Sequence, residues 1–106
     1  MFPRQYRLKK KKDFEGVYKK GKTISNEYFL FKFIENDLEN PRIGIIVSRR
    51  VLNKAVKRNL LKRRIREAIR NNFPEKNIDL VIIARKNIEN YQEIETLIKQ
   101  FYERLY

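Results

Sequence analysis

The sequence predicts one α+β domain, with elements in the order α-β-β-β-α-β-α and a four-stranded central sheet. Three observations predict it. A chain of 106 residues has room for one modest core, so we treat residues 1–106 as a single domain. The hydrophobic period changes between helical and alternating along the chain. Residues 80–84, LVIIA, are apolar throughout, as expected of an interior strand that is covered on both faces.

The first predicted elements are a basic arm and a short helix. Residues 1–10 are rich in Lys and Arg, and we expect an arm that stays mobile until it meets a phosphate backbone. Residues 11–20 have apolar side chains at helical spacing, and Gly21 follows at the position of a C-cap. Phe14 and Tyr18 share one helix face. An aromatic pair at this spacing is more often core, but it can also line a groove in which bases stack.

The next segments have the two-residue period of strands. Residues 23–34, taken as two strands, carry three aromatic side chains on one face, which we assign to the core. They are Phe29, Phe31 and Phe33. Lys32 lies on the opposite face. Turn-forming residues occupy positions 35–41 and a further alternating strand follows at 42–48, so we expect an antiparallel hairpin.

A basic helix is predicted for residues 54–70, with Asn53 as a possible N-cap. One arc of it is apolar. A second arc is basic and polar, and it contains Asn59, Lys62, Arg63, Arg66 and Arg70. A charge run is most often a solvated face, but a helix built for solubility would interleave acids, and this one has only Glu67. A nucleic acid therefore explains the charge better than solvation does.

Pro74 ends this helix, and residues 80–84 complete a β-α-β unit with the strand at 42–48. The last helix begins after Asn90, which can act as its N-cap together with Glu93. Its apolar stripe runs to the end of the chain and makes it structural.

The amino-acid composition excludes several classes of partner and of catalytic site. The net charge of +13 implies a polyanionic partner. We expect no membrane partner and a cytoplasmic location, because the chain has no long apolar run and no apolar segment after its basic start. The absence of His and Cys excludes zinc sites, thiol nucleophiles and Ser-His catalysis. The three glycines form no phosphate-binding loop, and we expect no small-molecule substrate.

The chain resembles the protein component of bacterial ribonuclease P along nearly its whole length. The segments that carry the resemblance are RLKKKKDFEGVYKKG, RIGIIVSRRVLNKAVKRNLLKRRIREAIR and DLVIIARK. Within the family's R-N-R signature, Arg58 and Asn59 match the first two positions and Leu60 departs at the third. The basic positions that follow are matched by Lys62, Arg63 and Arg66.

The resemblance implies a protein that binds a catalytic RNA and the single-stranded 5′ leader of precursor tRNA, and so assists removal of the leader. It places a leader-binding cleft between the first helix and the sheet, at Phe14, Tyr18, Lys32, Ser48 and Arg49. It also implies that hydrolysis belongs to the RNA, that Mg²⁺ enters through the RNA and not through the protein alone, and that the β-α-β crossover is left-handed. Physical rules alone would favour a right-handed crossover.

Two other functions explain part of the sequence. A ribosomal or other structural RNA-binding protein would carry the same charge, but it would not affect precursor tRNA cleavage. A stand-alone nuclease would have to cleave RNA without an RNA partner. The acidic residues show neither a paired-carboxylate nor a metal-binding pattern, so we expect no catalytic residue in the protein itself.

Overall fold

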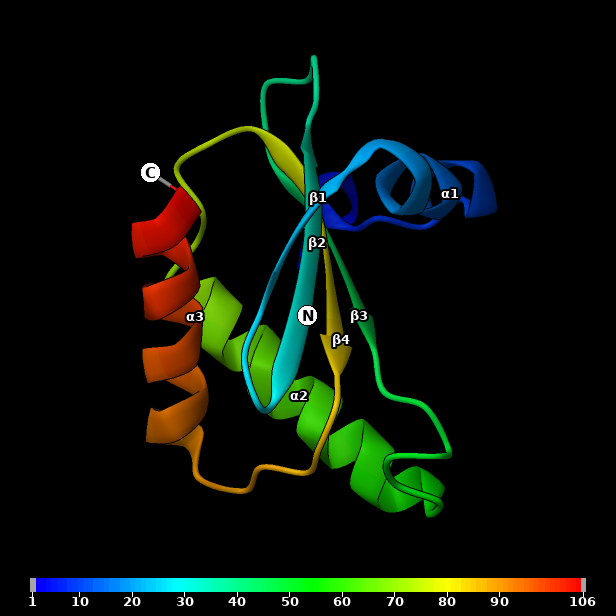
Figure 1. Cartoon of the computed structure of the whole chain (residues 1–106), viewed down its shortest axis with the longest axis vertical. Coiled ribbons are helices and arrows are strands. Elements are labelled where there is room, and N and C mark those ends of the chain that lie inside the picture. Colours follow the sequence, from blue (N-terminus) through cyan, green and yellow to red (C-terminus); the bar gives the residue numbers. More distant parts are fainter. Residues whose placement is uncertain (1, 106) are drawn as a thin grey trace.

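The computed structural model describes residues 2–105; Met1 and Tyr106, the two ends of the predicted domain 1–106, lie outside the described residues. The elements follow in the predicted order α-β-β-β-α-β-α, preceded by one short 3-10 turn (Figure 1). They are η1 (Arg4–Tyr6), α1 (Lys11–Lys20), β1 (Lys22–Ser25), β2 (Phe29–Glu35), β3 (Arg42–Ile46), α2 (Ala55–Asn71), β4 (Ile78–Ala84) and α3 (Tyr91–Leu105).

The strands form one mixed sheet in the order β1-β2-β4-β3. Strand β4 pairs antiparallel with β2 and parallel with β3. The hairpin predicted between residues 23–34 and 42–48 is therefore wrong, because β4 lies between these two segments. The reason is burial: every residue of β4 except Ile83 is buried, and a strand that is apolar on both faces gains most from an interior position.

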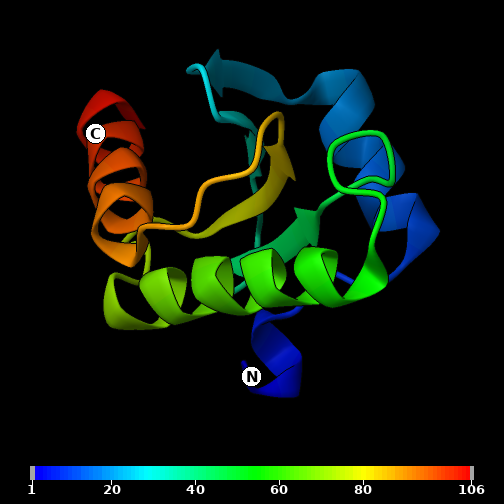
Figure 2. The ribbon, with the colours of Figure 1, turned by 90° about the horizontal axis from the view of Figure 1, so that it is seen from below.

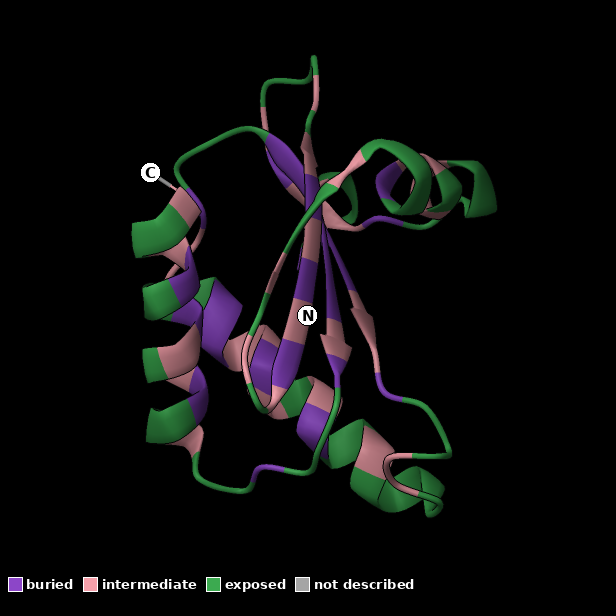
Figure 3. Ribbon diagram, in the orientation of Figure 1, coloured by how far each residue is buried: buried purple, intermediate pink, exposed green. Residues whose placement is uncertain are grey.

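Helices cover both faces of the sheet. In two perpendicular views, α2 and α3 lie on one side and α1 on the other (Figures 1 and 2). The larger core forms on the side of α2 and α3, and the smaller one joins Val17 of α1 to Val81 of β4 and Leu8 of the arm. Buried residues accordingly follow the sheet and the inward sides of the helices (Figure 3).

The three phenylalanines of β2 occupy the larger core, as predicted. Phe29 and Phe31 are almost completely buried, and Phe33 is 8% exposed. The ring of Phe31 stacks on Phe101 of α3 with a centroid distance of 4.3 Å and an angle of 9° between the planes. Phe33 meets the same ring edge-on. Aromatic packing therefore fixes α3 against the sheet.

The ends of the helices agree with the sequence in part. The side chain of Asn90 accepts a hydrogen bond from the backbone N–H of Glu93 at 3.0 Å, which confirms the predicted cap of α3. The predicted cap of α2 at Asn53 is wrong. Lys54 is the N-cap residue there, and it makes no side-chain capping bond.

The predicted arm lies against the domain. Phe2 is 5% exposed, and the backbone N–H of Leu8 donates to the carbonyl of Ile43 at 2.9 Å. The arm thereby covers part of the outer edge of β3, whose backbone groups would otherwise lack a partner there. The mobility expected of residues 1–10 before they bind RNA stays a prediction.

Strand β3, helix α2 and strand β4 form the predicted β-α-β unit, since the two strands are parallel neighbours. The left-handed crossover that the family resemblance implies stays a prediction. Among residues 2–105, no helix combines the length and the apolar character that crossing a membrane requires.

Gly21 ends α1 as predicted, donating its N–H to the carbonyl of Val17 at 2.9 Å. Its φ of −78° is ordinary, so a left-handed conformation is not the reason for glycine. Glycine is needed because the position has no room for a side chain: an added Cβ would press on the Val17 carbonyl oxygen and lie 2.8 Å from the carbonyl oxygen of Phe33.

We therefore expect Gly21→Ala to lower the free energy of unfolding by about 1 to 3 kcal/mol, as overpacking does. Gly16→Ala is the matched control in the same helix, because a Cβ there meets nothing within 4 Å. It should raise the free energy of unfolding by about 0.5 to 1 kcal/mol. Urea unfolding of both variants measures the difference. Equal effects at the two positions would contradict the packing argument.

Candidate nucleic-acid interface

Helix α1 forms one wall of the candidate site, because it turns two aromatic rings toward the sheet. The centroids of Phe14 and Tyr18 lie 6.5 Å apart. Phe14 reaches β3 at Gly44, where an added Cβ would lie 2.7 Å from two carbons of the ring. A glycine at this position therefore lets the helix approach the sheet closely. Phe14 is half-buried, whereas Tyr18 is 41% exposed and can meet a ligand.

Lys32 of β2 joins this pair from the sheet. Its Nζ lies 5.9 Å from the centroid of the Tyr18 ring, within the range of a cation–π interaction. A tyrosine hydroxyl is protonated at neutral pH and can donate a hydrogen bond, and burial raises the pKa of the Tyr18 hydroxyl further above that range. The structure thus brings together Phe14, Tyr18 and Lys32, three of the five residues predicted for the cleft.

An apolar row on the sheet, not predicted as part of the site, continues the surface. Leu30 of β2 pairs with Ile83 of β4, which in turn pairs with Ile46 of β3. All three are half-buried, whereas Val81, in the neighbouring row, lies fully buried in the small core with α1. Leu30 shares its face with Lys32, two residues away. The signal in the sequence is the second apolar face of residues 80–84, which the apolar run predicts to be fully covered.

Ser48 and Arg49, the other two predicted cleft residues, follow β3 and are both exposed. The carbonyl of Ser48 accepts the N–H groups of Val51 and Leu52, so the segment turns sharply before α2. In both ribbon views this loop and α1 project from the side of the sheet away from α3, with the loop at the lower right of Figure 1 and α1 at the upper right. Within the described part of the chain, no hydrogen bond, ion pair or ring contact joins them to Phe14 or Tyr18.

An ion network ties α1 to the sheet. Arg42 of β3 donates two hydrogen bonds to the buried carboxylate of Asp79, at 2.9 and 2.6 Å, and a third to Asp13 of α1 at 3.3 Å. Asn36 donates a further bond to Asp79 at 2.9 Å. The hydrogen bond to Asp79 is the main cause that raises the pKa of Arg42. The network therefore fixes where α1, and with it Tyr18, stands on the sheet.

The basic helix has the two faces that its spacing predicted. Its packing face is buried and consists of Leu61, Ile65, Ala68 and Ile69. On the other face Asn59, Arg63 and Arg70 are exposed, and Arg70 forms an ion pair with Glu67 at 2.6 Å. Lys62 and Arg66 are half-buried.

A hollow connects this face to the rest of the site. It has a volume of about 290 Å³ and is lined by Lys62 and Arg66 of α2, Lys9 of the arm and Phe14 of α1, with β3 alongside. Four cations therefore surround one concave, partly apolar surface: Arg7 and Lys9 of the arm, and Lys62 and Arg66 of α2. This combination suits the phosphate and sugar of a nucleotide.

Arg58 has a structural role that the sequence did not reveal. Its Nη1 donates hydrogen bonds to the carbonyls of Leu52 and Asn53, each at 2.9 Å. Through these bonds Arg58 holds the loop that carries Ser48 and Arg49 against the start of α2. Its remaining nitrogens can still meet RNA.

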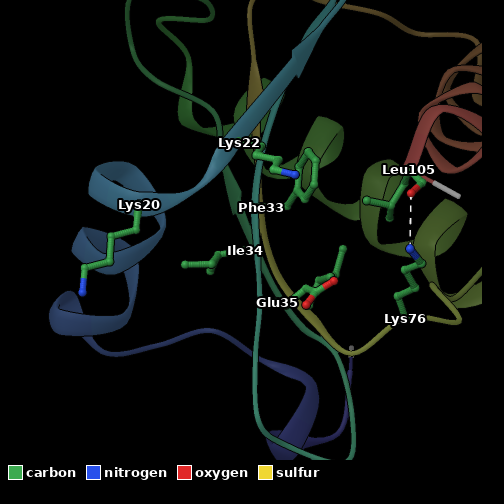
Figure 4. A pocket seen from close by; sticks show the side chains of 8 residues that line it. Lys20, Lys22, Phe33, Ile34, Glu35, Lys76 and Leu105 are labelled. Atoms are coloured by element: carbon green, nitrogen blue, oxygen red, sulfur yellow. Dashed lines mark hydrogen bonds between the residues drawn. The ribbon is translucent and has the colours of Figure 1, made fainter.

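A second hollow, of about 350 Å³, lies where the ends of α1 and α3 approach the sheet, and Lys20, Lys22 and Lys76 contribute to it. Figure 4 shows that these amines do not converge. Lys20 points away, and Lys76 donates to the carbonyl of Leu105 at 3.4 Å. This hollow is therefore not an anion site.

Comparison with known proteins identifies the family. The family model described as Ribonuclease P matches residues 2–106. The chain belongs to the ribonuclease P protein family. The ribonuclease P protein component of Thermotoga maritima is 40% identical over 97 residues, covering 89% of this chain and 82% of the relative. That of Clostridioides difficile is 39% identical over 108 residues, covering 97% of this chain and 94% of the relative.

Solved ribonuclease P proteins share the fold. The protein from Staphylococcus aureus superposes with a TM-score of 0.83 at 31% identity, over 94% of both chains. The Thermotoga maritima protein, solved with 1-(4-fluorophenyl)-2-thiourea, superposes with a TM-score of 0.83 at 35% identity, over 92% of this chain and 98% of that one. The family that the sequence resembles, the predicted fold class and the general function are thus confirmed. The chain is the protein subunit of ribonuclease P, the enzyme that matures tRNA 5′ ends, and its partner is RNA.

The contacts of Arg58 generate a prediction about stability. Arg58→Ala removes both bonds to the loop carbonyls and should lower the free energy of unfolding by about 1 to 2 kcal/mol. Arg58→Lys, which keeps a donor, should recover part of the loss. Arg63→Ala, on the exposed face, should stay within about 0.5 kcal/mol of the wild type. Chemical denaturation measures the free energy of unfolding of each variant. If Arg58→Ala and Arg63→Ala are equally stable, the loop does not depend on Arg58.

Proposed function

We propose that the protein binds the catalytic RNA of ribonuclease P through the basic face of α2, and the 5′ leader of precursor tRNA along the sheet beside α1. The observation that carries the proposal is the meeting of Tyr18 and Lys32 next to the apolar row Leu30–Ile83–Ile46. The cellular location that we propose is the cytoplasm.

This surface suits a single strand better than a duplex. An unpaired strand can turn its bases toward aromatic and aliphatic side chains, whereas a duplex presents phosphates and groove edges. The exposed ring of Tyr18 offers a stacking partner, and the ammonium of Lys32 lies where it can meet a phosphate. A 5′ leader is single-stranded and is present in precursor tRNA but not in mature tRNA, so it is the segment that we assign to this site. Ser48 and Arg49 belong to the proposed path because they are exposed and their loop, like α1, projects from the side of the sheet away from α3 (Figures 1 and 2).

The basic face of α2 is assigned to the folded catalytic RNA. The proposed contacts are Arg58, Asn59, Lys62, Arg63, Arg66 and Arg70. They come from a rigid helix anchored by its buried row, so they can meet phosphates at fixed spacing. The protein then holds the two RNAs from different sides of one domain.

The protein's own residues bind and orient, and hydrolysis is assigned to the RNA. Within residues 2–105 no group of three acidic side chains could hold a metal ion, and the sequence contains no His or Cys. We propose that Mg²⁺ is held by the RNA, where it would supply activated water for hydrolysis. Orienting the leader raises the fraction of precursor tRNA that is bound in a productive position.

Tyr18→Ala tests the leader site. We expect weaker binding of precursor tRNA by about 1 to 3 kcal/mol, because one base loses its stacking partner. Binding of mature tRNA, which lacks the leader, should stay almost unchanged. The measurement compares the affinity of the reconstituted enzyme for the two tRNAs. A loss of thermal stability, with normal discrimination between the tRNAs, would show that the aromatic pair is only core.

Salt dependence tests the basic face. Arg63→Ala and Arg66→Ala should each lower the slope of log affinity against log salt by roughly 0.7 to 0.9, since each phosphate contact releases counterions. Arg64→Ala is the matched control, because Arg64 projects about 140° from the centre of the proposed face. Its slope should change less. Equal changes of the slope in all three variants would mean that the helix attracts RNA through its overall charge and not through an oriented face.

A further inference from the structure

Two aliphatic side chains on the outer side of α2 belong to neither hydrophobic core. Val56 is 80% exposed and Leu60 is 37% exposed. They are four residues apart, so they lie next to each other on the helix surface. Large hydrophobic side chains are exposed at only four positions of the described chain, and these two form a pair. The buried row of α2 lies on a different side of the helix.

The surroundings of this pair are cationic. Lys57, Arg63 and Arg64 lie within three or four positions of Leu60 along the helix, and the only acid of α2, Glu67, is paired with Arg70. A second copy of this chain is a poor occupant, because each copy carries +13 and the same cations would meet across the contact. The occupant has to combine negative charge with an apolar surface. An unpaired nucleotide has both, a phosphate and the flat face of a base.

We propose that Val56 and Leu60 form an apolar contact for an unpaired nucleoside of the catalytic RNA. The proposal rests on the proposed function and adds a residue-level partner to it. A phosphate next to that nucleoside reaches Arg63, one turn from Leu60. At Leu60 the chain departs from the R-N-R signature, so here an apolar contact, which is insensitive to salt, stands beside the ionic ones.

Measurements of RNA affinity at several salt concentrations distinguish the apolar contact from the ionic contacts. The double variant Val56→Ala/Leu60→Ala should bind the ribonuclease P RNA of the same genome about tenfold more weakly at every salt concentration, from the loss of buried aliphatic groups. The slope of log affinity against log salt should equal that of the wild type. Arg63→Ala should instead flatten the slope.

Two single variants serve as controls for the double variant. Leu38→Ala removes a side chain that is 44% exposed, close to the 37% of Leu60, from the loop between β2 and β3, and it should leave affinity unchanged. Leu60→Met keeps the apolar volume and should retain wild-type affinity. Because the exposed positions do not support the core and Ala favours helix, urea unfolding should give the double variant at least wild-type stability. Chemical probing of the bound RNA should show an unpaired nucleotide that the wild type protects and the double variant leaves reactive.

Four results would overturn the inference. They are unchanged RNA affinity in the double variant, a slope flattened as much as by Arg63→Ala, an equal loss in Leu38→Ala, and a self-association of the wild type that the double variant abolishes. Failure of the proposed function is a different result, namely a wild-type protein that does not bind this RNA.

Discussion

Strand β4 has to be covered on both faces, and this requirement sets the positions of the helices. Its residues are buried apart from Ile83, and a buried backbone must also find hydrogen-bond partners on both edges. The partners are β2 on one edge and β3 on the other. Helices α2 and α3 cover one face, and α1 covers most of the other. The part that α1 leaves open is the row of Leu30, Ile83 and Ile46.

The candidate leader site is a consequence of this incomplete cover. Helix α1 is too short to cover the whole face, and its place is fixed by two local contacts. Phe14 packs on Gly44, and Arg42 bridges Asp13 of α1 and Asp79 of β4. These contacts leave Tyr18 exposed at the border of the open row, within reach of Lys32. The same packing that completes the core therefore leaves a ring, a cation and an apolar floor on the surface.

Much of the fold followed from local patterns. The first helix was predicted within its observed bounds, the phenylalanine face of β2 is core, and Asn90 caps α3. Periodicity reports which face of a segment is buried, but not which strand lies beside it, and for this reason the position of β4 was missed. The cap at Asn53 failed because capping depends on backbone angles at the end of a loop.

The site was predictable to a lesser degree. Phe14, Tyr18 and Lys32 were named from spacing and resemblance, and the structure brings them together. The hydrogen bonds of Arg58 to loop carbonyls could not be foreseen, because they depend on the path of the backbone before α2. The apolar row was hidden for a similar reason. It joins residues from three strands, and only the register places them side by side.

The central claim is that two RNAs occupy different surfaces of one small domain. Photo-crosslinking of precursor tRNA that carries 4-thiouridine in its leader, in the assembled enzyme, tests this claim most directly. Mass spectrometry should map the crosslinks to α1 and β2, at Tyr18 or Leu30. Crosslinks confined to residues 55–71 would show that the leader lies on the basic helix, and would contradict the separation of the two surfaces.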